Sequence, residues 1–278
     1  MRLAGPVFDT GDTPEGWVAA VRRAGYTASN VPLAPEADDA AVAAYVAAAR
    51  EAGIIIAEVG AWSNPLDPDP AKAAAAVEKC TRSLDLAERL GARCCVNIAG
   101  SRNPGRWDGP HPDNLTKDTF DLIVQTVRRI IDAVKPRRTF YTLEPMPWIF
   151  PSSADEYLDL LGAIDRPAAA VHLDPVNMVN CPSRAYRTGD FLRECFAKLG
   201  PRIRGCHAKD IVLRETLTVH LEECLPGTGV LDWPVFLREL AKLERDTPLL
   251  IEHLPRESYP AAAANIRDIA RRCGLAFA

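Results

Sequence analysis

The chain contains 278 residues, of which 47% are hydrophobic and 25% are charged, values that are ordinary for a globular protein and do not favour disorder. Its formal net charge of -4 argues against nucleic acid as the main partner, because neutralising phosphates requires a basic face. A small polar molecule suits this composition better.

The cysteine content and the apolar segments limit the possible environments of the chain. Eight cysteines are present without a Cys-x-x-Cys pair, so neither a zinc knuckle nor a disulfide scaffold is indicated. The N-terminus carries no apolar signal region, and no apolar stretch approaches the roughly 20 residues that span a bilayer. We therefore expect a cytoplasmic protein with reduced cysteines and no membrane partner.

The first half of the chain alternates apolar, β-prone runs with helical segments. Thr13-Pro14-Glu15 has the N-cap, the proline and the acidic first turn of a helix. Gly53 and Gly91 stand where C-terminal helix caps are expected. A long loop at 99–114 is rich in turn residues, which is typical of a functional loop. The predicted strands are 3–8, 26–31, 54–59 and 93–98, and the predicted helices are 14–24, 38–52 and 71–90.

The second half continues the alternation. Apolar residues recur at helical spacing from Phe120 to Val134, and Ser153-Ala-Asp-Glu156 is a capping-box pattern that begins the next helix. The longest interruption lies before the helix that begins at Asp232, and its segment 212–230 is expected to cover a pocket. The predicted strands are 141–144, 168–173, 203–207 and 248–252, and the later helices are 189–199, one from 232 and 259–272.

Eight predicted strands thus alternate with eight predicted helices, and no change in composition marks a second domain. This pattern predicts an α/β fold, a single (β/α)8 TIM barrel that spans residues 1–278 as one domain. A doubly wound open sheet is the competing architecture. It usually has a Gly-x-Gly-x-x-Gly turn after an early strand, and this chain has none.

Four predicted strands end in an oxygen or imidazole ligand. These residues are Glu144, Asp174, His207 and Glu252. Because the carboxyl ends of all strands in a closed barrel open onto one face, we expect the four side chains to converge there. Three carboxylates and one imidazole suit a single divalent ion such as Mn²⁺, Mg²⁺, Co²⁺ or Zn²⁺. The alternative is that each residue is an ordinary strand-end group paired with a nearby Arg or Lys.

These strand ends resemble the xylose isomerase-like TIM barrel superfamily, also called the sugar phosphate isomerase/epimerase family. It includes ketose 3-epimerases, inosose dehydratases and endonuclease IV-type nucleases. The resemblance is carried by Glu144, Asp174, His207-Ala-Lys-Asp210, Pro226-Gly-Thr-Gly-Val-Leu-Asp232 and Ile251-Glu252-His253. It implies that Glu144, Asp174, His207 and Glu252 bind one divalent metal ion. It also implies that Glu144 and Glu252 are catalytic and move protons.

The sequence departs from its relatives at particular positions. Asn177 stands where the ketose epimerases have a histidine, and the arginine that binds substrate in those enzymes has no secure counterpart, although Arg214 is nearby. The nuclease branch requires further histidines for a three-metal cluster, whereas this chain has five histidines in total. These differences argue against both a free ketohexose substrate and a nuclease.

Further polar and aromatic residues follow the predicted strands. The predicted substrate contacts are Lys209, Asn177, His111, Trp107, Trp148, His172 and His220. Lys209 and its neighbour Asp210 are expected to hydrogen-bond a substrate oxygen and to orient the imidazole of His207, with a salt-bridged strand end as the alternative. For His220 and Glu222 the alternative is a solvated loop. Trp62 is expected near the pocket mouth, and Glu58 is expected to support a ligand or to bind a substrate hydroxyl, with a structural role as the alternative. Strand alternation turns His253 towards the helices.

The predicted function is metal-dependent isomerisation or epimerisation of a sugar, keto-sugar or cyclitol by proton abstraction next to a carbonyl, through an enediolate, as part of carbohydrate metabolism. The same chemistry begins the elimination catalysed by inosose dehydratases and the cleavage catalysed by enzymes that deglycosylate C-glycosides, so a lyase is an open alternative. A non-catalytic sugar-binding barrel is another. A carbohydrate or cyclitol is the expected partner, and a homo-oligomer is compatible with the sequence.

Overall fold

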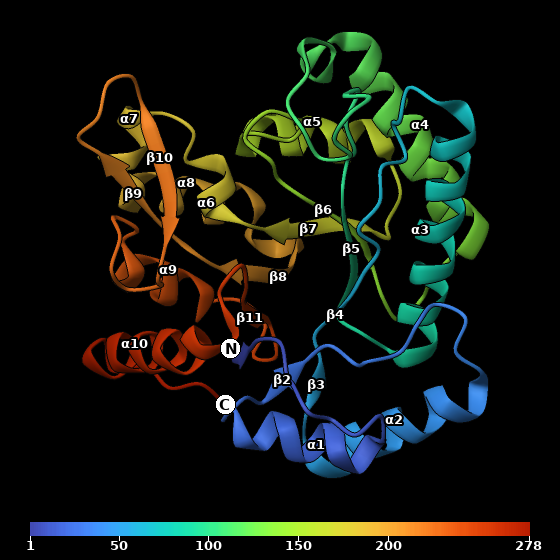
Figure 1. Ribbon diagram of the computed structural model, residues 1–278, viewed down its shortest axis with the longest axis vertical. Helices are drawn as coiled ribbons and strands as arrows, with labels where there is room; N and C mark the ends of the chain where they lie inside the picture. The colour runs from blue at the N-terminus through green and yellow to red at the C-terminus, as the bar shows by residue number, and fades with distance from the viewer.

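The computed structural model describes residues 1–278 and contains a closed barrel of parallel strands (Figure 1). β3 and β4 are two pieces of the third strand, separated by Ala57, and they stand at opposite ends of the sheet order, so the sheet closes on itself. The barrel strands are β1 (Arg2–Ala4), β2 (Ala28–Ser29), β3 (Ile55–Ile56), β4 (Glu58–Gly60), β5 (Cys94–Ile98), β6 (Tyr141–Glu144), β7 (Ala169–Leu173), β8 (Ile203–Ala208) and β11 (Pro248–Ile251).

Eight longer helices, one after each barrel strand, surround the barrel (Figure 1). They are α1 (Pro14–Arg23), α2 (Asp39–Ala52), α3 (Pro70–Leu90), α4 (Lys117–Val134), α5 (Ala154–Ile164), α8 (Thr188–Leu199), α9 (Trp233–Leu240) and α10 (Tyr259–Arg272). Shorter helices are α6 (Pro175–Met178), α7 (Pro182–Ala185), η1 (Pro112–Leu115), η2 (Gly200–Arg202) and η3 (Arg256–Ser258). The predicted (β/α)8 TIM barrel is confirmed.

Local sequence signals explain where several helices begin and end. The Thr13 side chain accepts a hydrogen bond from Gly16 N at the start of α1, and Ser153 does the same for Glu156 N at the start of α5. Gly53 and Gly91 end α2 and α3 with φ values of 67° and 66°, a left-handed conformation that costs glycine little. These caps set the points at which the chain turns back towards the barrel.

The structure differs from the sequence-based expectation in the first strand and in the segment between β8 and α9, among other places. β1 ends at Ala4 instead of continuing to residue 8, because Pro6 has no N–H to donate to a neighbouring strand. The long segment between β8 and α9 is not an open loop. It contains an antiparallel hairpin of β9 (Asp210–Arg214) and β10 (His220–Cys224), which stands apart from the barrel sheet (Figure 1).

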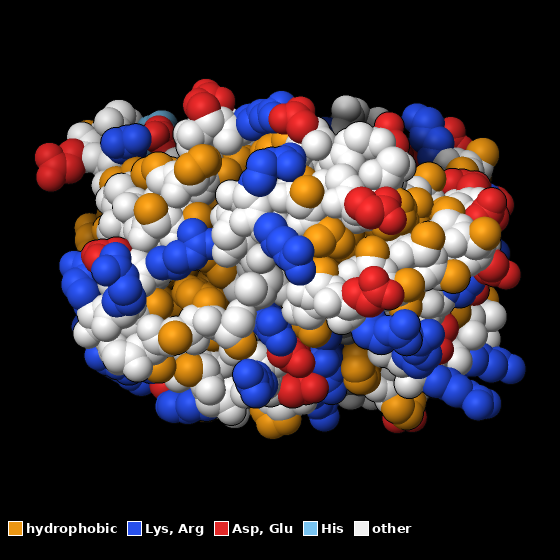
Figure 2. Space-filling model, turned by 90° about the horizontal axis from the view of Figure 1, so that it is seen from below, with side chains coloured by type: hydrophobic (Ala, Val, Ile, Leu, Met, Phe, Trp, Pro, Cys, Tyr) orange, Lys and Arg blue, Asp and Glu red, His pale blue; other side chains and the backbone are white.

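The ends of the chain meet beside the barrel, where Ala278 N donates to Met1 O at 3.1 Å (Figure 1). The face shown in Figure 2 carries basic and acidic side chains interspersed with hydrophobic ones, and no continuous basic surface is visible on it. None of the helices combines the length and the apolar character that crossing a membrane requires.

Candidate metal centre

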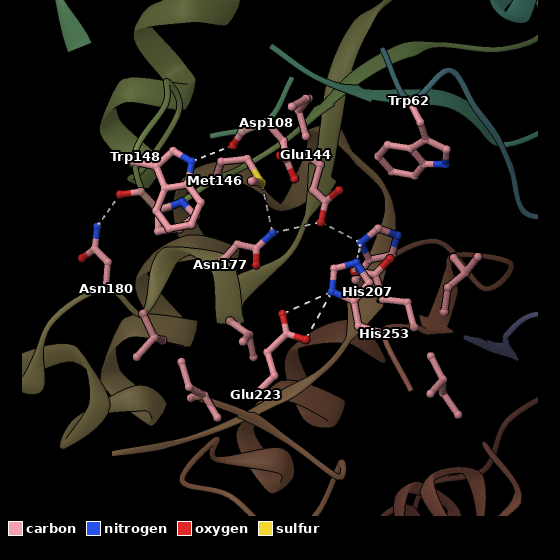
Figure 3. A pocket seen from close by; sticks show the side chains of 18 of the residues that line it. Trp62, Asp108, Glu144, Met146, Trp148, Asn177, Asn180, His207, Glu223 and His253 are labelled. Atoms are coloured by element: carbon pink, nitrogen blue, oxygen red, sulfur yellow. Dashed lines mark hydrogen bonds and ion pairs between the residues drawn. The ribbon is translucent and has the colours of Figure 1, made fainter. Parts of the chain in front are cut away.

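The four predicted ligands lie together at the carboxyl end of the barrel. Glu144 is the last residue of β6, Asp174 follows β7, His207 lies near the end of β8, and Glu252 follows β11. One potential ligand atom from each side chain lies within 4.8 Å of all the others. His207 Nδ1 is 3.1 Å from Glu144 Oε1 (Figure 3), 3.0 Å from Glu252 Oε1 and 3.6 Å from Asp174 Oδ2. The arrangement therefore places three carboxylates around one imidazole nitrogen.

Two buried carboxylate oxygens in this cluster, Asp174 Oδ2 and Glu252 Oε1, make no hydrogen bond of good geometry. Their nearest positive charge is the ammonium group of Lys209, 2.8 Å from the first and 3.2 Å from the second. Several buried carboxylates that share one ammonium group are costly unless a further cation compensates their charge. Oxygen ligands together with one imidazole suit Mg²⁺, Mn²⁺, Co²⁺ or Zn²⁺. The donor set therefore fits one divalent ion.

A lysine ammonium group lies at the edge of the same cluster. The Lys209 side chain is 2% exposed, and its Nζ lies 2.8 Å from Asp174 Oδ2, 3.2 Å from Glu252 Oε1 and 3.2 Å from Glu223 Oε1. Burial lowers the pKa of Lys209, but the surrounding carboxylates, Asp174 first, outweigh this effect and raise it well above its usual range. Lys209 is thus a charged group that partly neutralises the acidic cluster.

Asn177 connects Lys209 to Glu144. Its side-chain oxygen accepts a hydrogen bond from Lys209 Nζ at 2.8 Å, and its Nδ2 donates to Glu144 Oε1 at 3.0 Å (Figure 3). Burial raises the pKa of Glu144 to about 7 against the attraction of His207, and repulsion from Glu252 adds to the increase. Asn177 therefore hydrogen-bonds one oxygen of Glu144, whose charged form is disfavoured by burial and by repulsion from Glu252.

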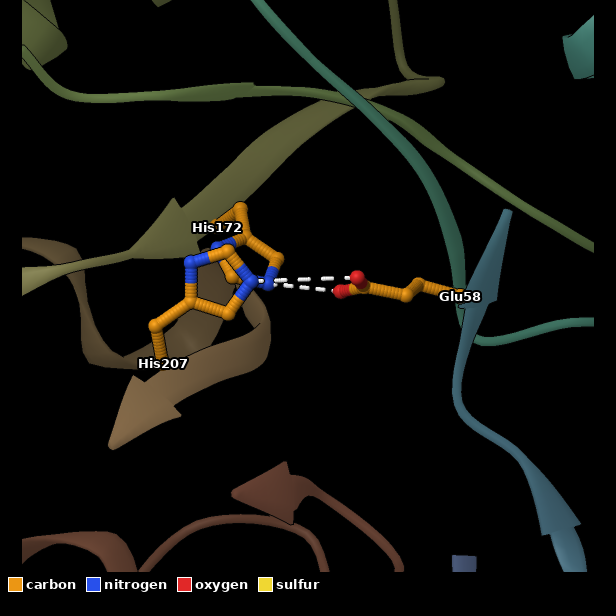
Figure 4. Close-up of side chains that lie close together, drawn as sticks. All are labelled: Glu58, His172 and His207. Carbon is orange, nitrogen blue, oxygen red and sulfur yellow. Dashed lines mark hydrogen bonds and ion pairs between the residues drawn. The ribbon is translucent and has the colours of Figure 1, made fainter. Parts of the chain in front are cut away.

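A second group of buried side chains lies behind His207. His172 Nε2 is 2.9 Å from Glu58 Oε2, and His207 Nε2 is 3.7 Å from Glu58 Oε1 (Figure 4). The two imidazole rings are 4.1 Å apart between centroids. His207 therefore presents Nδ1 to the carboxylate cluster and Nε2 to Glu58. In metal sites, a partner on the second ring nitrogen of a histidine ligand orients the imidazole in this way.

A cavity of about 1070 Å³ opens above the cluster and is lined by 26 residues. Of the predicted substrate contacts, Trp107, Trp148 and Asn177 line it, and so do Trp62 and Glu58. The other predicted contacts, Lys209, His111, His172 and His220, do not. His172 is fully buried beside Glu58, and the His111 side chain accepts a hydrogen bond from Asp113 N at the start of η1. His220 is exposed at the beginning of β10.

Sequence reasoning did not place Glu223 and His253 in the cavity wall, where both lie. His253 Nδ1 is 3.2 Å from Glu223 Oε2 (Figure 3). The expectation that His253 faces the helices fails because β11 ends at Ile251 and His253 has a φ of 56°, so strand alternation no longer applies. Glu223 lies on the hairpin, and only the pairing of β10 with β9 brings it back to the barrel mouth.

Asp210 has a structural role that differs from the predicted one. It was expected to contact a substrate or to orient His207. Instead its carboxylate accepts four backbone N–H groups and the indole N–H of Trp233 at 2.9 Å. The backbone donors are Ile211, Gly227, Gly229 and Leu231. Asp210 therefore fastens the turn after the hairpin to the barrel.

Comparisons with known proteins agree with this architecture. A model of the family described as xylose isomerase-like TIM barrel matches residues 18–271. No curated protein matches the sequence. A xylose isomerase-like TIM barrel protein from Mycobacterium smegmatis in complex with magnesium is 17% identical, with a TM-score of 0.67, and the match covers 94% of this chain and 89% of that one.

Two enzymes have a similar fold. The first is the D-psicose 3-epimerase of Clostridium cellulolyticum H10, solved with D-tagatose, which is 17% identical with a TM-score of 0.69 over 99% of this chain and 100% of that one. The second is the probable 3-DHS dehydratase of Bacillus anthracis, which is 14% identical with a TM-score of 0.71 over 98% and 100% of the two chains. At these identities the similarity shows the fold alone.

Proposed function

Because the chain belongs to the xylose isomerase-like TIM barrel family, we propose that it is a divalent-metal-dependent isomerase or epimerase. Its proposed substrate is a sugar, keto-sugar or cyclitol, and the proposed reaction removes a proton next to a carbonyl to form an enediolate. The family contains sugar isomerases and epimerases, and the D-psicose 3-epimerase shares the fold. Manganese or magnesium is the preferred ion, in keeping with the three carboxylates of the site.

The observation that supports this proposal best is the cluster of Glu144, Asp174, His207 and Glu252, in which three carboxylates surround one imidazole nitrogen at the floor of a large cavity. We assign these four residues as the metal ligands. A divalent ion bound there would polarise a substrate carbonyl and make the adjacent C–H more acidic. Glu58 would hold His207 in the required orientation through Nε2.

Glu144 and Glu252 are the proposed proton-transfer groups. Their strands, β6 and β11, are separated in the sheet by β7 and β8, and His207 Nδ1 lies about equally far from both carboxylates, at 3.1 Å and 3.0 Å. Because two strands lie between their own, we propose that the two carboxylates approach the bound compound from different sides. Removing a proton from one face of a carbon and returning it to the other requires such an arrangement.

The surroundings of these glutamates fit the same reaction. Lys209 offsets part of the negative charge of the cluster, and Asn177 keeps Glu144 Oε1 in place. Trp62 and Trp148 line the cavity and offer flat apolar surfaces on which the C–H faces of a sugar pack. The hairpin residues Val219 and Leu221 also line the cavity, which supports the proposal that segment 212–230 covers the bound compound.

A lyase is the second candidate, because the probable 3-DHS dehydratase has the same fold. Elimination of water or cleavage of a C-glycoside bond begins with the same proton abstraction. A non-catalytic sugar-binding barrel is a third candidate of a different class. The two glutamates in the cluster argue against it, because a binding protein does not need two metal-bound glutamates. NMR with keto sugars and cyclitols in D₂O distinguishes the three. An epimerase or isomerase exchanges a carbon-bound proton and forms an isomer, a lyase forms an unsaturated or cleaved product, and a binding protein does neither.

Metal content provides the direct test of the site. We expect about one divalent ion per chain in the purified protein and loss of most of it in His207→Ala, because the imidazole is one of four ligands. His220→Ala, which removes an exposed histidine outside the cavity, is the matched control and should keep its ion. Elemental analysis by mass spectrometry measures both. Unchanged metal content in His207→Ala would remove this residue from the site.

A further inference from the structure

We infer that the compound bound in the cavity is uncharged and carries an apolar group of about the size of an aromatic ring next to its polyhydroxylated part. This inference rests on the proposed function, since it concerns the substrate of the same site. It excludes phosphorylated sugars as the preferred substrates. Three observations carry it: the charges of the wall, the position of its aromatic rings, and the size of the cavity.

An anionic group bound in the cavity would find no unpaired positive charge in the wall. The only lysine or arginine in the wall is Arg106, whose side chain is 67% exposed and whose Nε is 2.7 Å from Asp108 Oδ1. Lys209 lies below the wall and is held by carboxylates and by Asn177. His253 is paired with Glu223. The acidic residues in the wall are Glu58, Asp108, Glu144, Glu223 and Glu252.

A phosphate group in this cavity would therefore face mainly negative charge. A bound divalent ion would not change this conclusion, because three carboxylates of the cluster already surround its position. Recognition of phosphate ordinarily requires arginine, lysine or several free backbone N–H groups. Hydroxyl groups, in contrast, are well matched by the carboxylates and by the Asn177 and Asn180 amides in the wall.

The aromatic rings form two separate walls (Figure 3). Trp62 lies next to the metal cluster, with its ring centroid 6.4 Å from that of His207. Trp148 lies on another side of the cavity with Met146, and its indole N–H donates to Asp108 O at 2.8 Å. Trp62 is thus placed to cover the reacting part of the bound compound, while Met146 and Trp148 form an apolar surface next to it.

The second wall is fixed in position relative to the cluster. Met146 and Trp148 follow the proposed ligand Glu144 by two and four residues. Asn177 Nδ2, which holds Glu144, also donates to Pro145 O at 3.0 Å, and Asn180 Nδ2 donates to Pro147 O at 3.4 Å. Because the same loop is fastened on both sides, the apolar surface is preformed.

The cavity is also larger than a simple sugar requires. Its volume of about 1070 Å³ slightly exceeds the roughly 300–1,000 Å³ of sites that bind drug-sized molecules. Half of the 26 lining residues are hydrophobic, and the hairpin contributes Val219 and Leu221. A free hexose would leave this apolar surface wet, whereas an aryl or comparable substituent would bury it.

Isothermal titration calorimetry on the manganese-loaded protein tests the inference without requiring turnover. The probes are glucose, fructose and inositol, their phenyl-substituted derivatives and their monophosphates. For at least one of the three parent compounds, we expect the phenyl derivative to bind about tenfold tighter or more than the free compound, and the monophosphate to bind no tighter than the free compound. Trp148→Ala should lose most of the gain from the phenyl group.

Tyr186→Ala, which removes an exposed aromatic ring outside the cavity, is the matched control and should retain the gain. If circular dichroism shows that Trp148→Ala is misfolded, Met146→Ala provides a second test of the same wall. Tighter binding of a monophosphate, or the lack of a phenyl gain for all three parent compounds, overturns the inference. Deuterium exchange in D₂O is measured separately, so a failure of the proposed function is recognised independently of substrate preference.

Discussion

Lys209 is the residue whose environment differs most from that of an ordinary surface lysine. Its ammonium group is buried between the carboxylates of Asp174, Glu252 and Glu223. The sequence left two interpretations open for Lys209, contact with a substrate oxygen or a salt-bridged strand end, and its contacts with protein carboxylates agree with the second. Its charge therefore belongs to the electrostatic balance of the cluster.

Replacing Lys209 by methionine should destabilise the metal-free protein more than the metal-loaded protein. Without the ammonium group, Asp174 and Glu252 repel each other in a buried site, which costs about 3–5 kcal/mol of unfolding free energy. A divalent ion supplies positive charge at the same place and should reduce the loss. Urea unfolding with and without a chelator measures the difference. Lys198→Met, at an exposed salt bridge, is the control, with an expected change within about 1 kcal/mol.

An equal loss of stability in the presence and absence of the ion would contradict this account. It would show that Lys209 acts through packing or through Asn177 alone, independently of the charge of the cluster.

The proposed roles of Glu144 and Glu252 are tested by single substitutions that keep the shape of the side chain. Glu144→Gln and Glu252→Gln remove one titrating group each. If the two roles are divided, one variant should exchange the substrate proton with D₂O without forming product, and the other should show the same defect starting from the product. The loss of product formation should be about 10²-fold or more. NMR with metal analysis of each variant separates loss of proton transfer from loss of the ion.

Glu222→Gln is the matched control for both substitutions. It makes the same chemical change at a glutamate that pairs with Arg214 outside the cavity, so it should leave proton exchange and product formation unchanged. Full interconversion by both Glu144→Gln and Glu252→Gln with the metal retained would show that neither carboxylate carries the proton.

Among the structural elements, the hairpin of β9 and β10 matters most for the site. It contributes Val219, Leu221 and Glu223 to the cavity wall, and Glu223 pairs with both Lys209 and His253. Its base is fastened separately, because Asp210 binds the turn that contains Gly227 and Gly229. The outer part of the hairpin can therefore be shortened without removing the hydrogen bonds that Asp210 makes to this turn.

Shortening the hairpin between residues 212 and 222 to a tight turn should therefore impair turnover more than folding. Removing Val219 and Leu221 admits water to the cavity, and we expect kcat/KM to fall about 10-fold or more on a confirmed substrate. The melting temperature should change by only a few degrees, because Asp210 and its bonded turn are kept. Steady-state kinetics and calorimetry measure the two effects. Full activity of the shortened protein would show that the hairpin does not cover the substrate.

At the scale of the whole molecule, the proposed ion would connect four of the barrel strands, β6, β7, β8 and β11. These strands are adjacent in the sheet and lie opposite the strands of the first half. β1 pairs with β11, and Ala278 bonds to Met1, so the two ends of the chain complete the same barrel. We propose on this basis that residues 1–278 form one domain.

Removing the ion should lower the melting temperature of the whole chain. An ion present at 100 times its dissociation constant stabilises the folded state by about 2.7 kcal/mol, which corresponds to roughly 5 °C or more for a protein of this size. Differential scanning calorimetry before and after chelation, with Mn²⁺ restored afterwards, measures the change. His207→Ala should melt at the same temperature with and without added Mn²⁺. A shift of similar size in that variant would place the stabilising ion elsewhere.

The sequence by itself determined the alternation of strands and helices and the positions of four polar groups at strand ends. These features depend on local patterns. Helix caps such as Gly53, the apolar stripe of α4 and the short apolar strands are all encoded within a few residues. The convergence of Glu144, Asp174, His207 and Glu252 then follows from the geometry of any closed parallel barrel.

Only the tertiary structure decided what surrounds those four groups. Glu223 reaches the cavity through the pairing of β10 with β9, His172 turns to Glu58 across the barrel, and His253 adopts a left-handed conformation after β11 ends. The physical reason is that each position is set by contacts between segments that are distant in the sequence. Periodicity specifies which face of a strand is buried, whereas the charge around Lys209 and the apolar wall at Trp148 arise where several loops meet.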